Sequence, residues 1–70
     1  MKQVVASMAG NVWKIVVNVG DHIEEGQDVL ILESMKMEIP IAAEAAGTVK
    51  EIKVQEGDFV NEGDLLIELE

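Results

Sequence analysis

The sequence has no cysteine and no arginine, and it contains one proline, one tryptophan and one phenylalanine. Without cysteine the chain can form neither disulfide bonds nor a thiolate metal site, so its stability must come from packing. The scarcity of aromatic rings leaves few surfaces on which nucleic-acid bases could stack. No apolar run approaches the roughly 20 residues that span a bilayer, and the N-terminus lacks the apolar region of a secretory signal. We therefore expect a cytoplasmic protein that does not insert into a membrane.

Positive charge is also scarce. Fourteen acidic residues and five lysines give the 70-residue chain a formal net charge of -9. This charge repels phosphate backbones, so nucleic acid is not an expected partner. Hydrophobic residues make up 49% of the chain, which argues against disorder. The length suits a single domain over residues 1–70, with little room for a deep active-site cavity.

The hydrophobic pattern predicts strands and turns rather than helices, because no stretch shows the 3.6-residue period of an amphipathic helix. Val29–Leu32 is short and rich in β-branched residues, which indicates a buried strand. Ile39–Ala42 alternates in polarity and contains Pro40, which favours an edge strand. Lys2–Ser7 and Asn11–Val17 are further strand candidates.

The sequence repeats itself at a spacing of 37 residues. Residues 10–33 align with residues 47–70, and ten of these 24 positions are identical, where average composition predicts about one or two. Each copy contains a Gly-Asp pair and a Glu-Gly pair, which mark two turns. The simplest interpretation is two copies of one β unit.

The repeat also predicts which side chains face inward, because a position that is apolar in both copies should belong to the core. Ile31 corresponds to Glu68 and should face outward or toward a partner. Trp13 corresponds to Lys50 and should be partly covered, and for this residue we favour a packing role at the rim of the barrel over a platform for a ligand. The residues assigned to the core are Ile15, Val17, Leu30 and Leu32 in the first copy, with Ile52, Val54, Ile67 and Leu69 in the second.

No catalytic set can be assembled from these residues. His22 is the sole imidazole and corresponds to Phe59, so we interpret it as a half-buried packing residue rather than a general base. Asp21 and Asp58 lack the ligand spacing of a calcium loop and fit turn chemistry better. No glycine-rich loop has the pattern of a phosphate site.

The segment Glu33–Glu38 breaks the local rules. Only two residues, Met35 and Lys36, are available to join two strands, and such loops favour Asn or Gly because both central residues take positive φ. A tolerated unfavourable turn often marks a functional site, so Lys36 is the candidate. The competing interpretation is a solvated surface lysine flanked by methionines that fill core gaps.

Modification by another enzyme suits Lys36 better than catalysis does. An exposed amine is deprotonated in only about one molecule in a few thousand at neutral pH, so unaided it is a poor nucleophile. An external enzyme could supply both the base and an activated acyl donor. If a two-fold axis relates the copies, Lys36 projects from the end opposite the termini.

The segment Glu33–Glu38, Glu-Ser-Met-Lys-Met-Glu, resembles the Glu-Ala/Ser-Met-Lys-Met signature of biotinyl domains in the biotin/lipoyl attachment family. Gly20–Gly26 and Gly57–Gly63 resemble the turn motifs of that family, and the resemblance covers nearly the whole chain. It implies an all-β fold, a flattened barrel (barrel-sandwich hybrid) of two four-stranded antiparallel sheets with quasi-two-fold symmetry.

The resemblance implies that a biotin protein ligase joins biotin covalently to Lys36. Met35 and Met37 would contribute to specificity, and Glu33 to recognition by the ligase. The domain would be a non-catalytic, monomeric carrier whose swinging arm moves between a biotin carboxylase and a carboxyltransferase, as in acyl-CoA carboxylases. The residues around Asn18 to Asp21 are too few for the protruding loop of some bacterial acetyl-CoA carboxylase carriers.

Alternatives of other classes stay open. Lipoyl carriers of the same fold serve 2-oxo acid dehydrogenases or glycine cleavage. They usually carry Asp-Lys-Ala in place of Met35-Lys36-Met37, so the resemblance favours biotin, although acceptance of both groups is a further option. Barrels that act only in assembly, as in periplasmic adaptor proteins, lack the lysine motif.

Overall fold

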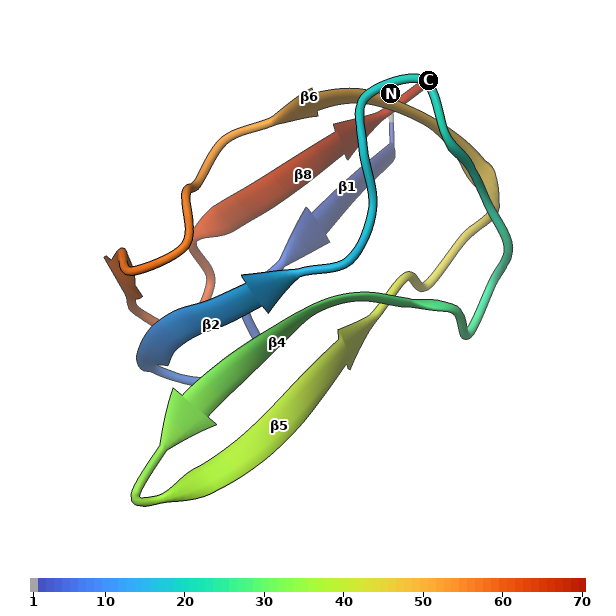
Figure 1. The fold of residues 1–70 in the computed structure, drawn as a ribbon. Helices are drawn as coiled ribbons and strands as arrows, with labels where there is room; N and C mark the ends of the chain where they lie inside the picture. The colour runs from blue at the N-terminus through green and yellow to red at the C-terminus, as the bar shows by residue number, and fades with distance from the viewer. Residues whose placement is uncertain (1) are drawn as a thin grey trace.

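A computed structural model describes residues 2–70, which form strands and turns (Figure 1). Among these residues there is no helix long and apolar enough to cross a membrane. The strands are β1 (Lys2–Val5), β2 (Gly10–Ile15), β3 (His22–Ile23), β4 (Asp28–Ser34), β5 (Met37–Ala42), β6 (Gly47–Ile52), β7 (Phe59–Val60) and β8 (Leu65–Leu69).

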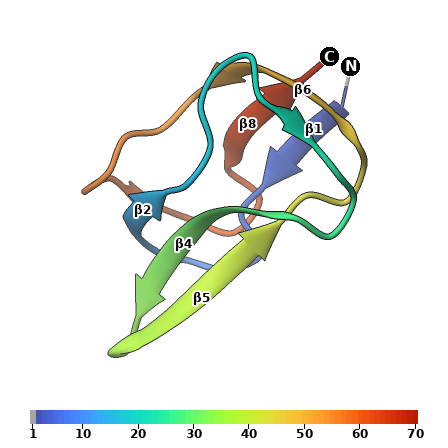
Figure 2. The ribbon, with the colours of Figure 1, turned by 45° about the vertical axis from the view of Figure 1, so that its right-hand side comes forward.

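The strands form two antiparallel four-stranded sheets with matching topology. One sheet has the order β1-β8-β6-β3 and the other has the order β5-β4-β2-β7. Exchanging β2 with β6, β3 with β7, β4 with β8 and β5 with β1 converts one order into the other. Figures 1 and 2 show the sheets as two facing layers. The all-β fold of two four-stranded sheets with quasi-two-fold symmetry is thus confirmed.

Each copy of the repeat completes the sheet of the other copy. The short strand β3 pairs with β6 of the second copy, and β7 pairs with β2 of the first. Two matching backbone hydrogen bonds join the copies: Gly20 N donates to Val49 O and Gly57 N to Val12 O, both at 2.8 Å. Neither copy is therefore a closed unit without the other.

The hydrophobic core lies between the sheets and confirms most of the faces that the repeat predicts. Ile15, Ile52 and Val54 are only partly buried and pack against the margin of the core, because Ile15 and Ile52 end their strands. Ile31 is partly exposed, as its match with Glu68 predicts. The predicted core residues that are buried are Val17, Leu30, Leu32, Ile67 and Leu69.

His22 contradicts the prediction of a half-buried packing residue. Its side chain is 67% exposed, and Nε2 lies 2.7 Å from a carboxylate oxygen of Glu24. Alternation within the two-residue strand β3 explains the error, because Ile23 is fully buried and its neighbour must face outward. Phe59 is exposed beside buried Val60 for the same reason.

Candidate functional site

The candidate site is the hairpin that joins β4 to β5. Ser34 and Met37 are the last paired residues, so Met35 and Lys36 alone form the turn. Their φ angles are 52° and 65°, the positive values that a type I′ turn requires at both central positions. In this left-handed conformation the backbone twist of the turn matches that of β4 and β5. For a residue other than glycine, the conformation has a free-energy cost of about 1–2 kcal/mol.

This hairpin differs from the other turns in the part of the chain that the structure describes. Elsewhere each residue with positive φ is a glycine, which takes this conformation without a steric penalty. Only Met35 and Lys36 adopt it with a side chain. Backbone strain among residues 2–70 is therefore concentrated at the candidate lysine. The glycines with positive φ are Gly20, Gly26, Gly57 and Gly63.

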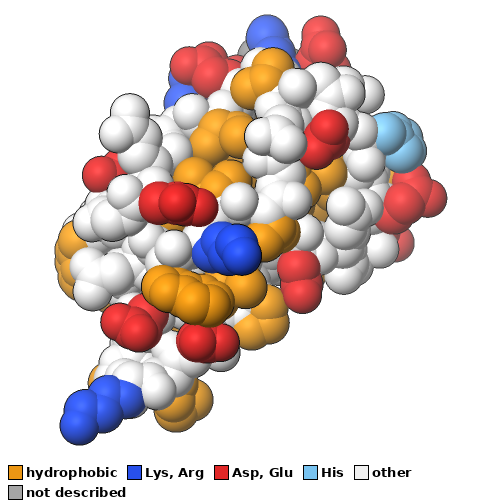
Figure 3. Space-filling model, in the orientation of Figure 1, with side chains coloured by type: hydrophobic (Ala, Val, Ile, Leu, Met, Phe, Trp, Pro, Cys, Tyr) orange, Lys and Arg blue, Asp and Glu red, His pale blue; other side chains and the backbone are white. Residues whose placement is uncertain are grey.

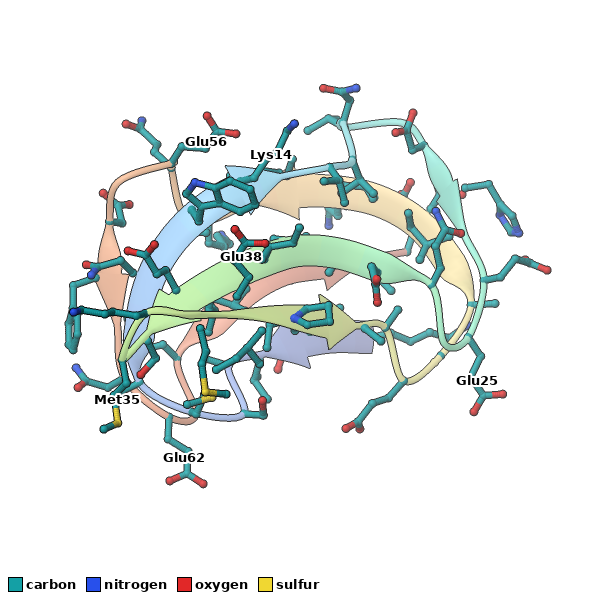
Figure 4. The ribbon with its side chains drawn as sticks, turned by 60° about the horizontal axis from the view of Figure 1, so that its bottom comes forward. Lys14, Glu25, Met35, Glu38, Glu56 and Glu62 are labelled. Atoms are coloured by element: carbon teal, nitrogen blue, oxygen red, sulfur yellow. The ribbon has the colours of Figure 1, made fainter. Side chains whose placement is uncertain are left out.

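The turn displays its side chains to solvent. Met35 is 91% exposed and Met37 is 61% exposed, so the interpretation of these methionines as core gap-fillers is wrong. Lys36 is exposed, and within residues 2–70 its amine has no hydrogen-bond or ion-pair partner. Figure 4 shows Met35 projecting away from the barrel. Figures 1 and 2 place this hairpin at the end of the molecule away from the start of β1 and the end of β8.

Two carboxylates lie beside the turn on neighbouring strands. Glu33 on β4 is directly opposite Glu38 on β5, and both are exposed. Like charges in this arrangement repel each other, and no described residue forms a salt bridge with either carboxylate. From the sequence we assigned a recognition role to Glu33, but we assigned no role to Glu38. The signal was available, because a two-residue turn at 35–36 fixes position 33 opposite position 38.

The described residues offer no enclosed site for chemistry. Residues 2–70 contain no pocket, and they bring together no group of three His, Cys, Asp or Glu side chains that could hold a metal ion. His22 belongs to β3, in the sheet that does not carry Lys36. The arrangement can therefore present one accessible amine, two apolar thioether side chains and two carboxylates to a partner.

Comparisons with known proteins agree with this geometry. A family described as "Biotin-requiring enzyme" matches residues 2–69. A biotin/lipoyl attachment protein of Bacillus subtilis is 67% identical over 62 residues, which cover 89% of this chain and 85% of that protein.

Two solved structures contain a similar domain. The urea carboxylase of Kluyveromyces lactis matches with a TM-score of 0.86 and 40% identity, over 93% of this chain and 6% of that one. A single-chain, multi-domain long-chain acyl-CoA carboxylase matches with a TM-score of 0.85 and 31% identity, over 93% of this chain and 7% of that one. The chain thus corresponds to a small part of each of these carboxylases.

Proposed function

The chain belongs to the family of biotin-requiring enzymes, and on that basis we propose that it is a biotin carrier modified on Lys36. The observation that carries this proposal is the turn itself. An unpaired amine stands on a strained, two-residue bend, between two methionines that are mostly exposed. The strands on either side hold the bend in place, which lowers the entropy lost when an enzyme docks on it.

Attachment requires a partner enzyme, a biotin protein ligase. In this reaction a base on the ligase takes a proton from the Lys36 amine. Nζ then attacks the activated carboxyl carbon of biotin, and an amide forms as the leaving group departs. The exposed Met35 and Met37 give the ligase an apolar contact on each side of the amine, and Glu33 gives it a charged one.

The carrier serves a biotin-dependent carboxylase. Bound biotin supplies a ureido nitrogen that accepts a carboxyl group in a biotin carboxylase and releases it in a carboxyltransferase. The chain contributes position rather than catalysis: it holds Lys36 at the end opposite the strand ends Lys2 and Leu69, which pair with each other. A tether near those strand ends would leave the modified lysine free to reach two separate active sites.

Intact mass spectrometry tests the proposal. The protein is incubated with biotin, ATP and a biotin protein ligase, and we expect one biotinyl group per chain. Lys36→Arg should abolish the mass gain, whereas Lys14→Arg, a change at another exposed lysine, should preserve it. An unmodified wild-type protein, or a full mass gain in Lys36→Arg, would refute the assignment.

Lipoate is the second candidate, because the Bacillus subtilis relative is named for both groups. The same assay with lipoate and a lipoyl ligase measures this activity on the same lysine. We expect biotin to be the faster substrate, since methionines occupy both positions beside Lys36. Faster loading with lipoate would assign the chain to the lipoyl branch of the fold.

A further inference from the structure

Three apolar residues lie close together on the outer surface of the sheet that carries Lys36, among charged ones. Ile31 on β4 lies between Lys14 on β2 and Pro40 on β5 in the register of the sheet. Trp13 occupies the bulge next to Lys14 and is 47% exposed. Figure 3 shows hydrophobic side chains gathered on this face of the molecule, over β2 and β4. We call the surface formed by Trp13, Ile31 and Pro40 the Trp13 face.

The fold does not require apolar residues at these positions. The repeat matches Trp13 with Lys50 and Ile31 with Glu68, and the bulge of β2 recurs in β6 beside Lys50. Gln3 pairs with Glu68 in the second sheet as Pro40 pairs with Ile31 in the first. Polar residues serve at all three equivalent positions of the second sheet, so the fold itself does not require these three positions to be apolar.

The size of the Trp13 face argues against a stable dimer. A half-exposed tryptophan contributes on the order of 100 Å², and the other two residues are smaller. A stable interface buries about 800 Å² on each partner. The Trp13 face alone therefore suits one part of a larger, transient contact.

The position of the Trp13 face points to the enzyme that works at the hairpin. Pro40 lies four residues along β5 from Lys36, which corresponds to about 13 Å at the rise of a strand. An interface of about 800 Å² per partner is a disc of roughly 16 Å radius. Pro40 therefore falls within an interface centred on Lys36, and Ile31 and Trp13 lie on the next two strands across the sheet, about 5 and 10 Å further over. Figure 4 shows Lys14 and Glu38 standing on the same side of this sheet.

We infer that the Trp13 face is a docking surface for the ligase that loads Lys36, an inference that rests on the proposed function. An unmodified lysine has only a four-carbon stem, so the ligase must touch the surrounding surface to reach Nζ. Biotin lengthens the arm, so a carboxylase can reach the end of the arm without covering this face. The matching ligase surface has an apolar pocket for Trp13 and basic side chains opposite Glu33 and Glu38.

Trp13→Lys tests the inference, because it installs the residue that the second copy already holds at the equivalent position. We expect kcat/KM for biotinylation to fall by about 10- to 30-fold, the effect of removing a tryptophan anchor. Val19→Lys is the matched control: it makes the same charge change at a valine that is 63% exposed, in the turn after β2, and should leave kcat/KM unchanged. Val19→Lys should keep the wild-type unfolding midpoint, and Trp13→Lys, which loses some buried apolar surface, should remain fully folded at the temperature of the assay. Wild-type loading rates in Trp13→Lys would overturn the inference.

Fluorine NMR provides a test that leaves Trp13 in place. Trp13 is the only tryptophan, so 5-fluorotryptophan gives one resonance. In the Lys36→Arg protein, this resonance should change its chemical shift when unlabelled ligase is added; broadening alone is not counted, because slower tumbling broadens the resonances of a bound chain wherever the ligase docks. An unchanged chemical shift at saturating ligase would overturn the docking surface.

A third measurement separates the ligase from the carboxylase. Trp13→Lys is loaded fully with excess ligase and then offered to a biotin carboxylase, where it should turn over as wild type does. Normal loading with impaired carboxylation would assign the Trp13 face to the carboxylase instead. If wild type itself is not modified at Lys36, the proposed function fails. If wild type is modified and Trp13→Lys is modified at the same rate, only the docking surface fails.

Discussion

Replacing Met35 with glycine should stabilise the protein while slowing its modification. Met35 has a φ of 52° and a side chain that is 91% exposed, so truncation removes almost no packing. Relief of the left-handed strain gains about 1–2 kcal/mol, and the greater freedom of glycine in the unfolded chain costs about 0.5–1 kcal/mol. The net gain of about 0.5–1 kcal/mol corresponds to a rise in Tm of about 2–8 °C for a domain of this size.

Met35→Ala is the matched control for this prediction. It removes the same side chain but retains a Cβ at positive φ, so its stability should stay near that of wild type. Thermal unfolding followed by circular dichroism measures the difference between the two variants, and the biotinylation rate is measured on the same samples. Both variants should load more slowly, because both remove the apolar contact that we propose between Met35 and the ligase. A glycine variant no more stable than the alanine variant would show that the turn stores no strain.

Two further changes probe the scaffold and the specificity of the turn. Gly47→Ala places a Cβ 2.8 Å from the backbone oxygen of Glu70, so chemical denaturation should show a loss of about 1–3 kcal/mol, and an unchanged midpoint would contradict this close approach. Met35→Asp combined with Met37→Ala should raise lipoate loading relative to biotin loading in a competition assay, and an unchanged ratio would show that the methionines do not discriminate.

The hairpin could be predicted from local rules, and most of the core from the internal repeat. The strands on either side leave only Met35 and Lys36 to form the turn, and the favoured two-residue hairpin turns require positive φ at one or both of these positions. The internal repeat supplied a second copy against which to read each face. Leu32 is apolar in both copies and fully buried, whereas Ile31 is apolar in one copy and partly exposed.

The exchange of strands between the copies could not be predicted in this way. Nothing in the two-residue strand β3 indicates that it pairs with β6 rather than with a neighbour in its own copy. The bulge at Trp13 could not be predicted from the sequence either, because it is a register shift in the pairing of β2 with β4. His22 was misassigned because the repeat matched it with Phe59, and an aromatic partner was taken as a sign of burial. Phe59 is itself 62% exposed.

The internal repeat separates what the fold needs from what remains for function. Where the copies agree, the structure supplies a reason: Gly20 and Gly57 have positive φ, and Asp21 and Asp58 accept backbone hydrogen bonds at 2.8 and 2.9 Å. Where the two copies differ on the outer side of a strand, as at Trp13 and Lys50, the fold does not require the residue type that the first copy has. The largest difference is that β4 continues into the hairpin, whereas β8 ends near the start of β1. Because the shared core is built from the inward-facing residues of both sheets, the outward-facing residues of one sheet can change to suit a partner while the core stays the same.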